Sequence, residues 1–234
     1  MVNKIIKKSL RYLVTLFLIA CLIGIFKSMV IDIYIVNGIS MEPTLHNGEY
    51  VFVDKYSYNI KTPEYIPFLN IKIPFLTFKG LDKPKIGDIA LFKLPVYRIG
   101  ERIPSDVTIV KRIAGLPGDT MKLNYEKFKS KIIFTFNKKN YFKTNKILIR
   151  VPRQGDTITV ADMNNQFIAD LIRNEGNTFK VKADDTILID GKPTKSYIVK
   201  KDYYFMRGDN KLNSSDSRNW GFLPKDKLIG KLLF

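Results

Sequence analysis

Apolar residues dominate the first part of the chain after a short basic segment. Lys4, Lys7, Lys8 and Arg11 precede the run Tyr12–Phe26, in which no residue is charged. This pattern is typical of a membrane-spanning helix, and the excess of cations before it predicts a cytoplasmic N-terminus. Everything after about residue 28 is then expected on the exported side of the plasma (inner) membrane.

The length of this apolar run leaves an alternative open. Its fifteen residues fall short of the roughly 20 that span a bilayer core, although Leu10 and the apolar residues 29–36 can extend it. A cleaved signal peptide has the same basic start and apolar middle, but no small-x-small cleavage pattern follows from Lys27 to Val30. The sequence therefore favours an uncleaved, single-pass anchor.

Beyond the anchor, short apolar or alternating runs are separated by Gly, Pro, Asn and Asp, which is typical of strands and turns. One segment, Ala161–Asn174, has helical spacing, with apolar residues such as Phe167 and Leu171 on one face. The pattern predicts a mostly β protein. The predicted strands are Ile31–Val36, Tyr50–Val53, Asp88–Phe92, Thr108–Ile113, Lys131–Phe136, Thr186–Ile189 and Tyr203–Met206.

Positive charge is concentrated in one part of the exported region. The chain has 39 Lys and Arg against 22 Asp and Glu, a net charge of +17. Nine of these cations and one acid, Glu126, lie between residues 120 and 150. Such a stretch is either a solvated, lysine-rich β surface or a face held against anionic lipid headgroups. Nucleic acid is not expected as a partner of an anchored, exported domain.

The segment Pro63–Phe78 combines bulky apolar side chains with three prolines, which exclude a regular helix. It is either an extended loop or hairpin packed on the core, or a segment whose apolar side chains contact the bilayer surface. The second alternative would keep the domain close to the membrane.

The chain has one cysteine and one histidine, Cys21 and His46. They exclude an internal disulfide and argue against a zinc site, so no metal and no organic cofactor is expected. His46 follows Ser40 in a polar turn, which leaves a Ser-His-Asp triad open. We interpret His46 as a surface turn residue, because nothing else in the sequence supports the triad.

Lys111 is the stronger candidate for a catalytic base. Alternation places it on the same strand face as its apolar neighbours Ile109 and Ile113. Burial disfavours the charged ammonium group and lowers its pKa from the ordinary value of about 10.4. A lysine needs this shift to accept a proton from a serine. The alternation alone also allows a strand lysine that extends to solvent.

Two further segments carry groups suited to catalysis. In VNGISMEPTL, from Val36, Ser40 lies on a tight turn and is either a nucleophile or an ordinary turn residue. The polar segment after Phe205 can hydrogen-bond to itself, with Asp216 and Arg218 as an ion pair, or it is a simple polar turn. Ser214 or Ser215 could offer a hydroxyl to a neutral lysine amine there.

Four segments together resemble the type I signal peptidases, membrane-anchored serine proteases with a Ser-Lys dyad. The four occur in the family's order and, with the anchor, span nearly the whole chain. They are SMEPTL from Ser40, GDIALFKLP over 87–95, VKRIAGLPGD from Val110 and GDNKLNSSDSRNWGF from Gly208.

The resemblance implies a coiled antiparallel β catalytic core, an inserted β-rich cap and an N-terminal transmembrane helix. The expected division is an N-terminal segment and anchor over 1–28, a core over 29–119 and 201–234, and a cap over 120–200. The substrates would be the signal peptides of exported preproteins, cut after small-x-small sites because shallow apolar pockets exclude large side chains.

The resemblance also assigns roles to residues. Ser40 would be the nucleophile and Lys111 the general base. The Ser40 N–H would bind the oxyanion. Some members have a residue with a donating hydroxyl two positions before the nucleophile, but this position is Gly38 here, so a backbone or solvent donor must replace that hydroxyl. Lys211 stands where an Arg is usual. The supporting residues are Ser214 on the lysine amine, the Asp216–Arg218 ion pair, and Gly208 and Asp209 at the start of the loop. The pocket residues expected from strand alternation are Tyr34, Val36, Met41 and Val110.

Three alternatives remain at this point. Self-cleaving repressors use a related Ser-Lys dyad, but they are soluble and carry a DNA-binding module that this sequence lacks. A specialised relative that matures one conjugation or secretion component would have the same motifs. A basic, lipid-binding domain without activity would require Lys111 to be solvated and charged.

Overall fold

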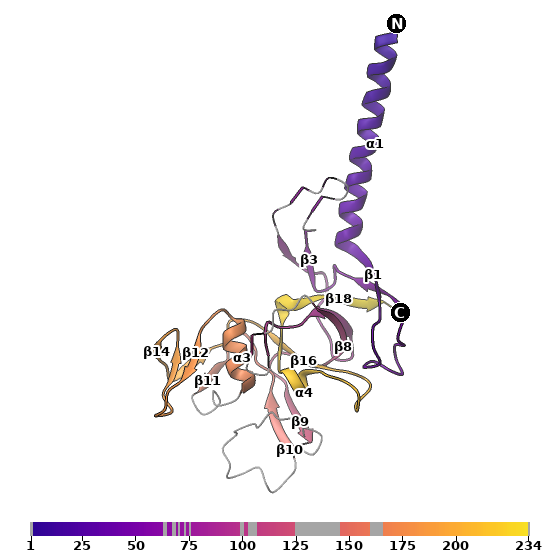
Figure 1. Ribbon diagram of the computed structural model, residues 1–234. Helices are drawn as coiled ribbons and strands as arrows, with labels where there is room; N and C mark the ends of the chain where they lie inside the picture. The colour runs from indigo at the N-terminus through magenta and orange to yellow at the C-terminus, as the bar shows by residue number, and fades with distance from the viewer. Residues whose placement is uncertain are drawn as a thin grey trace. The chain divides into compact units, whose positions relative to one another are not determined.

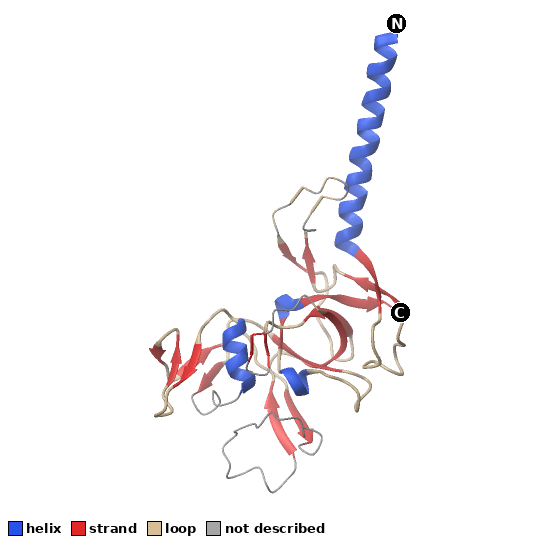
Figure 2. Cartoon of the chain, in the orientation of Figure 1, coloured by secondary structure: helices blue, strands red, loops and turns tan. Residues whose placement is uncertain are grey.

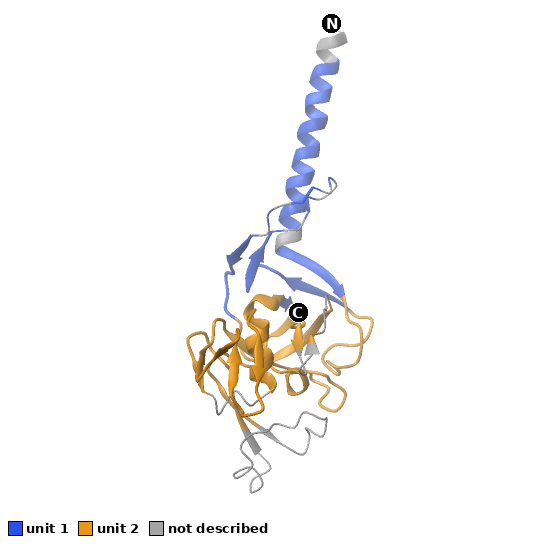
Figure 3. Cartoon of the chain, turned by 60° about the vertical axis from the view of Figure 1, so that its left-hand side comes forward, with its two compact units in different colours: residues 1–34, 50–83, 230–234 blue, residues 35–49, 84–229 orange. Residues whose placement is uncertain are grey.

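The computed structural model describes the chain in two compact units (Figure 3). Unit 1 comprises residues 1–34, 50–83 and 230–234, and unit 2 comprises residues 35–49 and 84–229. The prediction of a mostly β protein with an N-terminal apolar helix is confirmed (Figures 1 and 2). The described residues are 2–62, 65–66, 69, 71–72, 74, 76–98, 101–102, 107–124, 146–159 and 166–233.

Unit 1 begins with the long helix α1 (Val2–Val30). Its segment Ile6–Lys27, 22 residues long, is long and apolar enough to cross a membrane. The helix passes directly into strand β1 (Ile31–Ile35), where isoleucine alternates with other residues. Of the apolar residues 29–36, only the first two therefore extend the helix, because β-branched residues at alternate positions favour a strand.

The remaining strands of unit 1 are short and antiparallel. Strand β2 (Tyr50–Asp54) pairs with β18 (Leu228–Leu233), with Val53 opposite Leu232. Strands β3 (Asn59–Lys61) and β4 (Thr77–Lys79) form the base of a hairpin. Five of its apolar side chains are not packed on a core, since they are between 43% and 54% exposed. These side chains belong to Tyr65, Leu69, Ile71, Leu76 and Phe78.

Unit 2 contains a curled antiparallel sheet in which β8 (Thr108–Gly115) is central (Figure 1). Strand β5 (Ile89–Lys93) pairs with β8 along residues 108–112. Strand β16 (Tyr203–Arg207) pairs with β8 only along residues 112–115, and β17 (Leu223–Pro224) follows β16. Burial alternates along β8, which gives the strand one buried face, as its sequence predicts.

The chain between β8 and β16 adds small sheets and one helix. The hairpin of β9 (Thr120–Asn124) and β10 (Lys146–Arg150) comes first. The other elements of unit 2 are β6 (Tyr97–Arg98), β7 (Glu101–Arg102), β11 (Thr157–Thr159), α3 (Gln166–Asn174), β12 (Phe179–Val181), β13 (Ile187–Ile189), β14 (Lys192–Pro193), β15 (Ser196–Ile198), α4 (Ser217–Trp220) and the 3-10 turn η2 (Lys225–Lys227).

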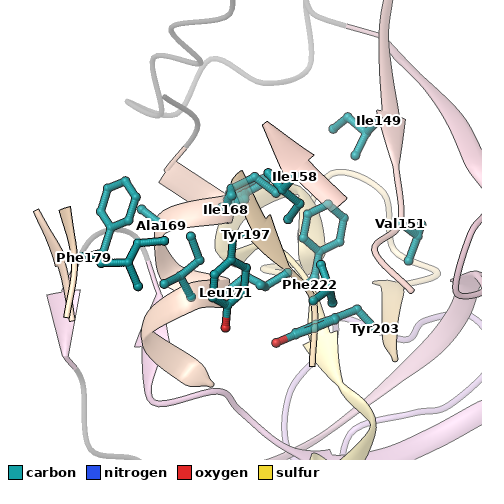
Figure 4. Packing of buried hydrophobic residues seen from close by; sticks show 14 of the residues in the cluster. Ile149, Val151, Ile158, Ile168, Ala169, Leu171, Phe179, Tyr197, Tyr203 and Phe222 are labelled. Atoms are coloured by element: carbon teal, nitrogen blue, oxygen red, sulfur yellow. The ribbon is translucent and has the colours of Figure 1, made fainter. Parts of the chain in front are cut away.

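Helix α3 lies over the main apolar core of unit 2 (Figure 4). It buries Phe167 and Leu171, as the helical spacing predicts, together with their neighbours. The same core includes Tyr203 and Phe205 of β16, so the central sheet and the added elements share one apolar interior. The predicted strand Lys131–Phe136 and the first residues of the predicted helix, 161–165, lie outside the described residues.

Candidate active site

The turn that carries Ser40 is closed at its base by main-chain hydrogen bonds. The Val36 N–H donates to the Glu49 carbonyl (2.9 Å), and the Gly48 N–H donates to the Val36 carbonyl (2.8 Å). Inside the turn, the Gly38 N–H donates to Asn47 Oδ1 (2.8 Å). Gly38 has φ 99°, a left-handed conformation that glycine adopts without strain. The buried side chains of Met41 and Leu45 fix the turn to the interior.

Lys111 reaches this turn from the buried face of β8. Its Nζ lies 2.6 Å from Ser40 Oγ and donates to its neighbour's carbonyl, that of Val110, at 3.0 Å. The Lys111 side chain is 4% exposed, and this burial lowers its pKa to about 8, although the charge of Asp216 acts in the opposite direction. The lysine side chain that extends to solvent, which the alternation also allowed, is therefore not what the structure contains.

These contacts give the pair the properties of a nucleophile and its base. A hydroxyl within hydrogen-bond distance of an amine can pass its proton to that amine when the amine is neutral. The lowered pKa makes a substantial neutral fraction available near pH 8.

The loop after β16 contacts the turn that carries Ser40, here called the nucleophile turn (residues 36–49) after the predicted role of Ser40. The Asn210 N–H donates to the Ser40 carbonyl (3.1 Å), and Asn210 Nδ2 donates to the Ile39 carbonyl (3.1 Å). Gly208 lies so close that a Cβ there would be 2.5 Å from the Ser40 carbonyl oxygen and 2.0 Å from Ser214 Oγ. Only glycine fits at this position.

Asp216 and Arg218 form a buried, bidentate ion pair. Arg218 Nε and Nη2 donate to the two Asp216 oxygens, each at 2.7 Å, and neither side chain is more than 10% exposed. Asp216 also accepts from the Gly208 N–H (2.9 Å) and caps the N-terminus of α4. The pair therefore holds the loop in shape from within.

Ser214 lies in the same loop, with its Oγ buried against Gly208. Within the described residues this hydroxyl has no hydrogen-bond partner, so the expected bond to the Lys111 amine is not formed in this conformation. The Lys111 amine donates to Ser40 and Val110 instead.

Three further residues beside Ser40 and Lys111 were not singled out from the sequence: Arg112, Thr44 and Asn210. Arg112 forms a bidentate ion pair with Asp209, and Asp209 also accepts a hydrogen bond from Thr44 Oγ1 at 2.5 Å. Asn210, described above, is the third. The only available signal was the position of Arg112 directly after Lys111, on the opposite strand face, which does not identify a partner ninety-seven residues away.

The other expected site residues fall in different surroundings. Val36 is buried at the base of the nucleophile turn, and Val110 points to the face of β8 opposite Lys111. Tyr34 belongs to β1 of unit 1, where burial and Asp32 raise its pKa. His46 is exposed, and its N–H donates to Glu49 Oε2 (2.8 Å), which confirms it as a surface turn residue.

The Ser40 N–H has no acceptor among the described residues, and nothing lies within 4 Å of the position of a Cβ on Gly38. A developing oxyanion would therefore find a main-chain donor beside the nucleophile. In the described part of the chain, no three His, Cys, Asp or Glu side chains are grouped so that they could hold a metal ion.

Comparison with known proteins agrees with this geometry. Residues 9–234 match the family model "Signal peptidase, peptidase S26". Signal peptidase I of Buchnera aphidicola from Baizongia pistaciae is 30% identical, over 97% of this chain and 76% of the relative. The protein of the same name from Pseudomonas aeruginosa is 26% identical, over 88% of this chain and 65% of its own.

The fold and the family match define a serine peptidase, a hydrolase of peptide bonds. The chain belongs to the signal peptidase family, whose members remove signal peptides.

The pKa of Lys111 predicts a pH dependence. If the neutral amine is the base, kcat/KM rises about tenfold per pH unit below pH 8 and levels off above it. Activity at pH 6 is then on the order of 1% of the plateau. Initial rates of cleavage between pH 5.5 and 10, with the stability of the protein checked at each pH, measure the acidic limb of this profile, the range in which kcat/KM rises with pH. A limb near pH 6.5 would point to a histidine instead.

Proposed function

We propose that this protein removes signal peptides from exported preproteins with a Ser40–Lys111 dyad. The observation that supports the proposal most directly is the 2.6 Å contact between Ser40 Oγ and a buried lysine amine. The family membership supplies the reaction class, and the contact supplies the two groups that can perform it.

In the proposed reaction, neutral Lys111 accepts the Ser40 proton while Oγ attacks the scissile carbonyl carbon. The Ser40 N–H donates to the oxyanion of the tetrahedral intermediate. The Lys111 ammonium group then protonates the leaving amine, and an ester between Ser40 and the signal peptide results. Lys111 next takes a proton from the water that attacks the ester carbon. It returns this proton to Ser40 Oγ as the acyl–Oγ bond breaks, which releases the signal peptide with a free carboxyl group and restores the serine.

The N-terminal part of β8 offers a place for the substrate chain. Because β16 pairs with β8 only from Arg112 onward, residues 108–110 have no strand partner on that side in the described structure. An extended peptide can pair with such an edge. The peptide would then run directly toward Lys111 and Ser40, since Val110 immediately precedes the base.

The proposed specificity is for small side chains before the cut. The proposed pocket residues of unit 2 are Val36, Met41 and Val110, and the first two are buried in the turn that carries Ser40. Shallow apolar surfaces of this kind admit alanine and exclude larger side chains. N-terminal sequencing of the product from a purified preprotein tests the proposal, with a cut after a small-x-small site as the expected result.

We also propose that α1 anchors the protein in the plasma membrane as a single span, with its N-terminus in the cytoplasm. The cations before the span and the apolar segment Ile6–Lys27 support this orientation. The exposed apolar side chains of the β3–β4 hairpin, which belongs to the same unit as α1, suit contact with the bilayer surface. Anionic lipid is the proposed partner of the lysine-rich residues 120–150.

Membrane extraction tests the anchor. The full chain is expected to stay in the membrane pellet after alkaline carbonate treatment. Leu16→Arg combined with Ile19→Arg should release it, because each central arginine costs about 2.5–3.5 kcal/mol of insertion free energy. Leu148→Arg is the matched control, since Leu148 is 57% exposed on β10 and outside the helix. Release of the wild type, or retention of the double variant, would contradict the anchor.

A further inference from the structure

Three side chains from distant parts of unit 2 form a continuous link beside the dyad. Arg112 donates from Nε to Asp209 Oδ1 (2.8 Å) and from Nη2 to Asp209 Oδ2 (2.6 Å). Thr44 Oγ1 donates to the same Oδ2 at 2.5 Å. One carboxylate thus joins the base strand β8, the loop after β16 and the nucleophile turn.

The two ends of this link are connected directly to the reacting residues. Arg112 follows Lys111 in β8 and is fixed further by donation from Nη1 to the Gly87 carbonyl (2.7 Å). Thr44 lies in the same turn as Ser40, and its N–H donates to the Met41 carbonyl (2.9 Å). A displacement of either end would change the 2.6 Å distance between Ser40 Oγ and Lys111 Nζ.

The carboxylate at the centre is suited to hold both ends. The hydrogen bonds from Arg112 lower the pKa of Asp209, so the group is ionised throughout the pH range in which Lys111 titrates. A hydroxyl that donates to an ionised carboxylate makes a stronger bond than one between neutral groups. The Thr44 bond therefore restrains the turn more than an ordinary turn contact does.

We propose that Thr44 is a positioning residue for the Ser40–Lys111 pair and acts through Asp209 and Arg112. Thr44 does not contact the reacting atoms. Its hydroxyl sets where the nucleophile turn lies relative to the base strand, and a misplacement of about 1 Å can lower a rate by about 10²-fold. This inference rests on the proposed dyad.

Thr44 is the member of the link that can be replaced without leaving a charge unpaired. Its side chain is exposed, and its loss leaves the ion pair of Asp209 and Arg112 in place. Removing Asp209 instead would leave the charge of Arg112 unpaired at 33% exposure, and removing Arg112 would leave the charge of Asp209 unpaired at 17% exposure. Thr44→Val keeps the shape of the side chain and deletes only the hydroxyl, whereas Thr44→Ser keeps the hydroxyl.

Steady-state kinetics of the full-length, detergent-solubilised protein on a purified preprotein tests the proposal. Thr44→Val is expected to lower kcat about tenfold, the effect of one lost charge-assisted hydrogen bond, with KM within about twofold of wild type. Thr44→Ser should recover most of kcat. The kcat/KM limb should stay near pH 8, because positioning changes the plateau and not the titration of the base.

Thr178→Val is the matched control, because Thr178 Oγ1 also donates to an aspartate, Asp190, elsewhere in unit 2 (3.3 Å). It should leave kcat unchanged. The proposal is overturned if Thr44→Val retains wild-type kcat, if Thr44→Ser does not recover it, or if the thermal midpoint falls and accounts for the loss. Ser40→Ala and Lys111→Met are assayed in parallel: if they still cleave, the dyad itself is wrong, and if only they are inactive, the role of Thr44 alone is wrong.

Discussion

Replacement of Ser40 by alanine, or of Lys111 by methionine, is expected to lower preprotein cleavage on the order of 10⁴-fold or more. Ser40→Ala removes the oxygen that we propose attacks the substrate, and Lys111→Met removes the amine 2.6 Å from it. Methionine suits the Lys111 site because that side chain is 4% exposed, so the variant should remain folded. Gel assays of preprotein conversion, with N-terminal sequencing of the product, measure the effect.

His46→Ala is the control for this experiment and should cleave at nearly the wild-type rate, because His46 is exposed and contacts Glu49 only through its main chain among the described residues. An inactive His46→Ala together with an active Lys111→Met would show that histidine is the base and that the dyad is wrong. If the wild type cleaves no preprotein, a single specialised substrate or a binding function becomes the better hypothesis.

The second large effect is expected on stability, when Asp216 is replaced. Asp216→Asn should lower the free energy of unfolding by about 3–5 kcal/mol, because it leaves the buried Arg218 charge without a full partner. Asp216 is 0% exposed and also accepts hydrogen bonds from the main chain of Gly208 and Arg218. Urea unfolding of the full chain in detergent, followed by tryptophan fluorescence of Trp220, measures the change.

Asp226→Asn is the matched control for Asp216, since Asp226 pairs with Lys201 at 3.0 Å where both side chains are substantially exposed. Loss of this exposed pair should cost less than about 1 kcal/mol. A second readout concerns the base: the charge of Asp216 raises the pKa of Lys111, so the residual activity of Asp216→Asn should have its limb below pH 8. Equal stability losses in the two variants, or a limb above pH 8, would contradict this account.

The elements with a local pattern could be predicted from the sequence. Alternation identified the face of β8 on which Lys111 lies but left open whether its side chain is buried or extends to solvent, and helical spacing identified α3. The prediction of His46 as a surface residue is confirmed for the same reason, since a polar turn has no apolar face to bury. The end of α1 at Val30 was less clear, because apolar residues continue across it into β1.

The contacts between distant segments could not be predicted in this way. Thr44, Arg112 and Asp209 lie in three segments, and no periodicity in any one of them reports on the others. Whether the Ser214 hydroxyl bonds to the Lys111 amine depends on side-chain packing within a folded loop, and residue spacing does not determine that packing. The expected pocket residues and the domain boundaries at 119 and 200 stay predictions.

The close approach at Gly208 has a consequence for how the site keeps its shape. There the backbone of one loop touches the backbone of the nucleophile turn, with the Ser40 carbonyl also accepting from the Asn210 N–H. Peptide units have few accessible conformations, whereas side chains exchange between rotamers. The position of Ser40 therefore depends on contacts between main-chain segments as well as on side chains, so exchange between rotamers alone does not release this end of the turn.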